Sequence, residues 1–132
     1  MSSRPKQGSP TALPRLTPER SGCPIASTLD LIGDKWTLVI VRDLLTGKSQ
    51  FSQFLDSPEG ISTNILASRL KALERAGVVS RTLYRTRPDR YGYALTPRGE
   101  ALLPVVQAIC RWGNAQIDKT WTPPAWFMEK TV

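Results

Sequence analysis

The sequence of 132 residues contains no histidine, which is the side chain that proteins use most as a general base and as a metal ligand. It also has no Gly-x-Gly-x-x-Gly run, no phosphate-binding loop and no Cys-x-x-Cys pair. Its two cysteines, Cys23 and Cys110, are too few for a disulfide framework and too distant for a convincing zinc site. We therefore expect no catalytic residue, no metal and no cofactor, and we predict that the chain is not an enzyme.

Long apolar runs are missing as well. No stretch approaches the length that crosses a bilayer, and the first residues lack the apolar segment of a secretory signal. We expect a cytoplasmic protein without a membrane partner. The length predicts one domain.

Positive charge is abundant and unevenly distributed. The net charge is +7, yet residues 23–61 carry three positive and five negative side chains, whereas residues 62–100 carry eight positive and three negative ones. A clustered basic patch is typical of proteins that bind a polyanion.

The N-terminal part divides into an arm and two helices. Residues 1–22 contain four prolines and no apolar period, which predicts a disordered basic arm that either attracts DNA or only keeps the chain soluble. A short amphipathic helix is expected over residues 24–33. A second helix, over residues 35–46 with Asp34 as its cap, is apolar on nearly every side and should centre the core, with Trp36 as its largest anchor.

Two helices joined by a tight turn follow, the pattern of a helix-turn-helix. The first is expected over residues 50–57, and the second runs from a capping Ser62 to Gly77, which suits the left-handed residue after a helix. The polar face of the second helix carries no acidic residue, which suits a DNA major groove, although an ordinary solvated face looks alike. Its apolar stripe is Leu66, Leu70 and Leu73, and its polar face is Asn64, Ser68, Lys71 and Arg75.

Beyond Gly77 the apolar period changes to two. Residues 79–84 and 91–95 alternate as strands of a hairpin, and the segment between them holds a Pro-Asp turn signal and three arginines. A hairpin beside such a helix is a wing, whose arginines either meet phosphates and the minor groove or merely keep a loop soluble.

The C-terminal part predicts one long helix over residues 97–119, with Thr96 as its N-cap. Its apolar stripe is too long to be buried on so small a domain, so we expect it to pack on a partner subunit. Residues 121–132 form a tail that is apolar enough to dock on its own chain or across a dimer. Cys110 lies on the stripe and is expected to be a buried small hydrophobe.

Several separate runs, in their order and spacing, resemble the HxlR-type winged helix-turn-helix regulators over residues 22–118. These runs are Cys-Pro-Ile at 23–25, Ile-Gly-Asp-Lys-Trp-Thr at 32–37, Phe-Ser-Gln-Phe-Leu at 51–55, Gly-Ile-Ser at 60–62 and Tyr-Ala-Leu-Thr-Pro-Arg-Gly at 93–99.

The resemblance implies a mainly α fold with a small β-hairpin, namely a winged helix-turn-helix with N- and C-terminal dimerisation helices over residues 23–120. It implies a bacterial transcription regulator, here a repressor, that binds an inverted-repeat operator in double-stranded DNA as a homodimer. A winged helix that binds only proteins is the alternative. The predicted DNA-binding residues are Lys48, Ser62, Thr63, Asn64, Ser68, Arg69, Lys71, Arg85, Arg87 and Arg90, and the predicted dimer contacts are Ile25, Leu29, Leu102, Val105, Val106, Ile109 and Trp112.

Some members of this family sense electrophiles or oxidants through a cysteine at the position of Cys23. A thiol at a helix N-terminus has a lowered pKa, which makes sensing plausible, whereas the Cys-Pro pair also suits a purely structural role at the start of a helix. An electrophile or another small molecule is therefore an expected effector, and no residue pattern identifies a ligand.

Overall fold

The computed structural model describes residues 20–132, so most of the expected basic arm, residues 1–19, lies outside the described part. The described part of the chain divides after Asp34 into two units, residues 20–34 and 35–132, which are described separately. In the first unit α1 (Pro24–Ile32) begins after the extended residue Cys23, with Pro24 in its first turn, and ends at Gly33, whose N–H donates to Leu29 O at 2.8 Å. Arg20 forms an ion pair with Asp30 on this helix.

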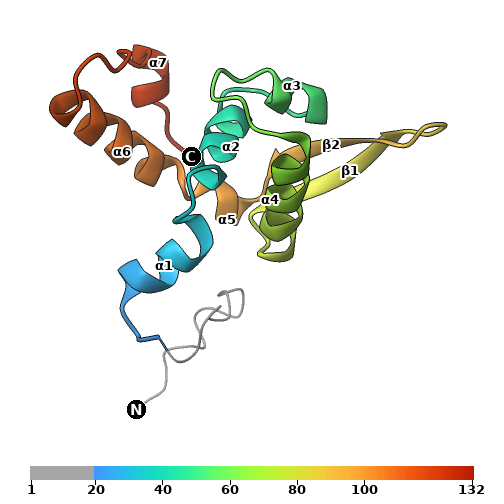
Figure 1. Ribbon diagram of the computed structural model, residues 1–132, viewed down its shortest axis with the longest axis horizontal. Coiled ribbons are helices and arrows are strands. Elements are labelled where there is room, and N and C mark those ends of the chain that lie inside the picture. The colour runs from blue at the N-terminus through green and yellow to red at the C-terminus, as the bar shows by residue number, and fades with distance from the viewer. Residues whose placement is uncertain (1–19) are drawn as a thin grey trace. The chain divides into compact units, whose positions relative to one another are not determined.

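The second unit is a mainly helical fold with one hairpin (Figure 1). The elements are α2 (Thr37–Leu45), α3 (Phe51–Leu55), α4 (Thr63–Arg75), β1 (Val79–Arg85), β2 (Arg90–Leu95), α5 (Pro97–Glu100), α6 (Leu103–Gln116) and α7 (Ala125–Met128). The predicted hairpin is confirmed, with β1 and β2 antiparallel and Val79 opposite Leu95. On the other edge of β2, Gln50 forms a bridge with Gly92, which fixes the start of α3 beside the hairpin.

The second predicted helix starts later than expected. The N–H of Ile40 donates to Trp36 O at 3.0 Å, so Trp36 rather than Asp34 is the N-cap of α2. Trp36 is only half-buried, with the Lys35 ammonium 5.3 Å from the centre of its ring. The prediction that Trp36 anchors the core is therefore wrong, because its side chain precedes the helix. Val41 and Leu45 of α2 instead enter an apolar cluster with Leu103, Val106 and Phe127.

The single long helix predicted over residues 97–119 is also wrong. A turn at residues 101–102 separates α5 from α6, and α6 ends at Gln116. Pro104 explains the break, because it has no N–H and its ring would clash with the carbonyl of Glu100 in a continuous helix. At the other end Ile117 is extended, and the Asn114 amide donates to Thr120 Oγ1 at 2.8 Å, which holds the returning chain.

The C-terminal tail docks on its own chain. Phe127 of α7 is buried in the cluster with α2 and α6. The buried amide of Gln107 donates to Phe127 O and to Lys130 O, both at 2.9 Å. Residues 125–130 are therefore part of the folded second unit.

Candidate nucleic-acid interface

Helix α4 has the start and the end that its sequence predicts. Ser62 is extended, and its Oγ accepts from the N–H of Ile65 at 3.2 Å. The helix ends at Ala76, and Gly77 adopts a φ of 74°, which a residue with a side chain rarely adopts. The N–H of Val78 then donates back to Leu73 O at 2.9 Å. These contacts fix both ends of the helix and thereby the direction of its faces.

Burial divides α4 into the two predicted faces. Leu66, Leu70 and Leu73 are each at most 2% exposed. Arg69 lies at the border between the faces and is half-buried. The opposite face is exposed along the helix and consists of Thr63, Asn64, Ser68, Lys71 and Arg75. It presents hydrogen-bonding groups and two positive charges and no carboxylate, so it can approach a negatively charged groove.

A buried carboxylate that sequence reasoning missed holds the turn before α4. Asp43 on α2 is 3% exposed, and its Oδ2 accepts from the hydroxyl of buried Ser57. Lys48 Nζ donates to the same Ser57 Oγ at 2.7 Å and lies 3.9 Å from Asp43 Oδ2. The ammonium of Lys48, predicted to contact DNA, is thus directed at this pair. Asp43 is the acidic residue of a mostly apolar helix, but no local feature of the sequence marks its side chain as buried.

Arg42 links the same helix to the residue that precedes Gly60. Its Nη1 and Nη2 donate to the two carboxylate oxygens of Glu59 at 2.6 and 2.9 Å, while Nη2 also donates to Asp43 Oδ1 at 2.8 Å. The guanidinium of Arg42 lowers the pKa of Glu59 below its ordinary value, and the Glu59 carboxylate raises the pKa of Arg42. The bidentate pair fixes the chain three residues before the N-cap of α4.

The hairpin carries Arg85, Arg87 and Arg90 at and beside its tip, all exposed. Arg85 lies opposite Arg90 across the strands, after an irregularity in their register. Figure 1 shows β1 and β2 projecting to the right, away from α4 and the other helices. The predicted arginines are therefore brought together at one end of the hairpin, away from the core.

The hairpin is fixed to α3 and α4 by contacts that the sequence did not reveal. Arg81 on β1 lies with its guanidinium 4.1 Å from the centre of the Tyr91 ring and with Nε 3.6 Å from Glu74 Oε2 on α4. Tyr93 on β2 packs edge-to-face on Phe54 of α3, with ring centres 6.2 Å apart, and burial raises the pKa of its phenol. Helix and wing are thereby held in one arrangement.

Comparison with known proteins decides the family. A profile of HxlR-like helix-turn-helix proteins matches residues 31–121, which is more than half of the chain. The chain belongs to the HxlR-like helix-turn-helix family.

Similar proteins support the same conclusion. YdeP of Bacillus subtilis, described as an uncharacterised HTH-type transcriptional regulator, is 37% identical over 98 residues, which are 74% of this chain and 77% of YdeP. The reduced form of the redox regulator HypR has a TM-score of 0.67 and 33% identity, and the match covers 73% of this chain and 95% of HypR. The reduced form of the transcriptional regulator YodB from Bacillus subtilis has a TM-score of 0.62 and 30% identity, over 76% of this chain and all of YodB.

This HxlR-like protein is accordingly a DNA-binding transcription regulator with a winged helix-turn-helix fold. Within residues 20–132 no helix is both long and apolar enough to traverse a bilayer. In the same part of the chain no three potential ligands among histidine, cysteine and carboxylates gather as a metal site would require.

The predicted dimer contacts fall into two groups. Val106 is buried in the cluster around Phe127, and Leu102 packs against that cluster. The others expose apolar surface on α1 and α6. Ile25 and Leu29 are 70% and 52% exposed, Ile109 and Trp112 are 52% and 65% exposed, and Val105 is 37% exposed.

Cys23 is exposed at the N-terminus of α1. The backbone N–H groups of Ala26 and Ile25, in the first turn of α1, lower the pKa of its thiol. They favour the thiolate, which is the reactive form. Cys110 is half-buried and packs against the cluster of α2, α6 and α7.

Proposed function

We propose that this HxlR-like regulator binds an inverted-repeat operator as a homodimer and represses transcription. The observation that carries the proposal is the exposed, carboxylate-free face of α4 beside an arginine-tipped hairpin that Arg81 and Tyr93 hold in place. A helix in the major groove and a wing on the backbone are the two contacts that such an arrangement supplies.

Each predicted DNA-binding residue has a role in this proposal. Asn64 and Ser68 read base edges, because amide and hydroxyl groups on an exposed helix face pair with bases. Thr63 and Lys71 contact bases or adjacent phosphates, and Arg69 contacts the backbone from the flank. The three wing arginines, Arg85, Arg87 and Arg90, bind phosphates. Ser62 and Lys48 stay proposed contacts at the groove edge, although both polar groups also have partners within the protein.

Exposed apolar side chains support the homodimer. Ile109 and Trp112 lie one helical turn apart on α6, and Ile25 and Leu29 lie one turn apart on α1. A soluble monomer rarely leaves several large apolar side chains uncovered on one face of a helix. A twofold dimer would present two copies of α4 about 34–36 Å apart, which is one turn of DNA.

Titration of the DNA upstream of the protein's own gene tests the proposal. We expect the full chain to bind a labelled upstream fragment at least a thousandfold more tightly than a shuffled fragment, as about 4 kcal/mol of specificity requires. Deleting the gene should raise expression of a reporter driven by that fragment. A protein that binds neither fragment even at low salt would be a protein-interaction module instead.

The exposed thiol of Cys23 supports a second candidate function, regulation by oxidants. A thiolate attacks one oxygen of hydrogen peroxide, which forms an S–O bond and releases hydroxide, so the sulfur is oxidised to a sulfenic acid while the peroxide is reduced. That relatives such as HypR are redox regulators supports the same role. We expect mild peroxide to change the operator affinity of the wild type and not of Cys23→Ser. Equal responses of the two proteins would exclude sensing through this thiol.

A further inference from the structure

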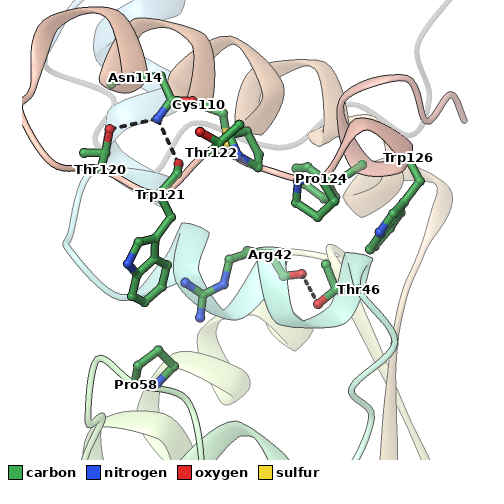
Figure 2. A pocket seen from close by; sticks show the side chains of 13 residues that line it. Arg42, Thr46, Pro58, Cys110, Asn114, Thr120, Trp121, Thr122, Pro124 and Trp126 are labelled. Atoms are coloured by element: carbon green, nitrogen blue, oxygen red, sulfur yellow. Dashed lines mark hydrogen bonds between the residues drawn. The ribbon is translucent and has the colours of Figure 1, made fainter.

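A pocket of about 440 Å³ lies between α2 and the segment that returns from α6 to α7 (Figure 2). Arg42 of α2 and Thr46, the C-cap of that helix, line one side, and Trp121 and Trp126 line the other. In Figure 2 the two indoles stand at opposite ends of the pocket, with Pro124 between them. All of these residues belong to the second unit. The size is that of a site for a drug-sized molecule.

The lining is suited to an uncharged aromatic ligand. Three aromatic residues and three prolines, together with three threonines, make up most of the lining, and its exposed surface is mainly apolar, which favours flat apolar molecules. The charged group, Arg42, donates four hydrogen bonds to the carboxylates of Glu59 and Asp43, which neutralise its positive charge, so it attracts an anionic ligand only weakly. Asn114 donates to Thr120 Oγ1 and to Trp121 O, so its amide hydrogens are committed as well.

Two of the lining residues connect the pocket to the DNA-reading helix. Pro58 lines the pocket and directly precedes Glu59, which pairs with Arg42. Gly60 then adopts a φ of 75°, and Ser62 caps α4 two residues later. A ligand that touches Pro58 and Arg42 therefore acts on the short segment that sets the direction of α4.

We propose that this pocket binds an uncharged, planar aromatic small molecule and that its occupancy changes DNA affinity through Pro58 and the Arg42–Glu59 pair. The proposed ligand site depends only on the observed pocket. The proposed effect on DNA affinity also rests on the proposed function, which is DNA binding.

The first experiment measures ligand binding to the full chain with two matched fluorescent probes. N-phenylnaphthylamine is uncharged, and anilinonaphthalene sulfonate is the same ring system with one negative charge. We expect the uncharged probe to bind with one site per chain and at least tenfold more tightly than the sulfonate, because Arg42 is already neutralised. A sulfonate that binds as tightly as the uncharged probe would overturn the assigned ligand class.

Variants place the probe in the pocket. Gly113 lines it from α6, and a Cβ built there meets no heavy atom within 4 Å, so Gly113→Leu can start its side chain without disturbing the helix. Ala115→Leu adds the same side chain on the same helix to an exposed residue outside the pocket lining. We expect Gly113→Leu to weaken the uncharged probe at least tenfold and Ala115→Leu less than twofold. Trp121 is 78% exposed, so Trp121→Ala should fold and also weaken the probe several-fold.

The outcomes separate the competing occupants. Equal probe affinity in the wild type, Gly113→Leu and Trp121→Ala would place the probe elsewhere and overturn the site. If the dissociation constant of the uncharged probe rises at protein concentrations that favour the dimer, a second copy of the chain occupies the pocket. That result would also overturn the proposed ligand site.

The second experiment tests the coupling between the pocket and DNA binding. It measures the affinity for the upstream DNA fragment with and without saturating uncharged probe. We expect at least a fivefold change in DNA affinity for the wild type and none for Gly113→Leu, with the reciprocal change in probe affinity that linkage demands. Unchanged DNA affinity with a filled pocket would overturn the coupling and leave the site standing. Absent DNA binding in both conditions would overturn the proposed function, while the probe titration would still decide the site.

Discussion

Asn64 and Ser68 lie one helical turn apart on the exposed face of α4, and Asn64 is the longer of the two. An asparagine that makes a bidentate contact to adenine contributes roughly 1–3 kcal/mol of discrimination. We predict that Asn64→Ala reduces discrimination at one base pair of each half-site by that amount and leaves nonspecific affinity unchanged. Selection of binding sites from a randomised DNA pool would measure the profile. An identical profile for the variant would remove Asn64 from direct readout.

The Arg42–Glu59 pair predicts a pH dependence of stability. The pKa of Glu59 lies below its ordinary value of 4.5 because the Arg42 guanidinium donates to the carboxylate. The folded protein therefore binds fewer protons at Glu59 than the unfolded chain, so this contribution is complete above the unfolded pKa and is lost as the pH falls through the folded pKa. We predict that Glu59→Gln lowers the free energy of unfolding at neutral pH by less than about 1 kcal/mol, because the pair is partly exposed.

Urea unfolding at several pH values measures this effect. The difference between wild type and Glu59→Gln should shrink as the pH falls below about 4. Glu129→Gln, at an exposed residue of the C-terminal segment, is the control and should show no such dependence. A difference that stays constant down to low pH would assign the cost to packing rather than to charge.

At the residue scale the sequence predicted what depends on local backbone chemistry. Ser62 and Gly77 were identifiable because a cap and a left-handed residue have short-range signatures, and the structure confirms both. Asp43 was not identifiable, because its burial depends on Ser57, fourteen positions away on another segment. The position of the Lys48 ammonium follows from the same long-range pair.

The hairpin gives a prediction at the scale of elements. Arg87 is exposed at the tip, and a phosphate contact there is independent of sequence. We predict that Arg87→Ala weakens binding to operator and shuffled DNA by a similar factor and reduces the slope of log affinity against log salt by roughly 1. Titrations at several salt concentrations would measure both quantities. Ser80→Ala, at an exposed residue near the base of β1, is the control and should leave the slope unchanged. An unaltered slope for Arg87→Ala would mean that the tip does not touch DNA.

Helices and strands were predictable where the spacing of their apolar residues continues without interruption. The alternation over β1 and β2 and the leucine stripe of α4 meet this condition. The stripe over residues 97–119 runs through Pro104, and the apolar spacing hid the break that the missing N–H imposes. The same spacing also assigned Val106 and Ile109 to a single face of the helix, whereas Val106 is buried in the core and Ile109 is exposed.

At the scale of the whole molecule, the sequence could not reveal which apolar surface stays within the chain. Phe127 and Trp112 have similar apolar character, yet Phe127 is buried beside α2 and Trp112 is 65% exposed. The buried amide of Gln107 holds the tail that carries Phe127, because it donates to the carbonyl groups of Phe127 and Lys130. The surface left for a partner is therefore defined by what the tail has already covered.

That remaining surface yields a prediction about assembly. Ile109 is 52% exposed on α6 and would be buried in the proposed dimer. We predict that Ile109→Asp makes the protein monomeric in sedimentation experiments, because a carboxylate would lose its water without gaining a partner. Since a monomer engages only one half-site, its operator affinity should fall roughly a hundredfold or more, while its affinity for shuffled DNA changes little.

Val132→Asp is the matched control, because Val132 is also apolar and exposed but lies at the end of the tail rather than on α1 or α6. It should leave both sedimentation and operator affinity unchanged. The monomer is stabilised by the buried cluster of α2, α6 and α7, and Ile109 is not part of that cluster. Ile109→Asp should therefore unfold near the urea midpoint that the wild type approaches at low protein concentration, where it is monomeric. A dimer that persists in Ile109→Asp would show that α6 does not form the interface and would redirect the search to the apolar face of α1.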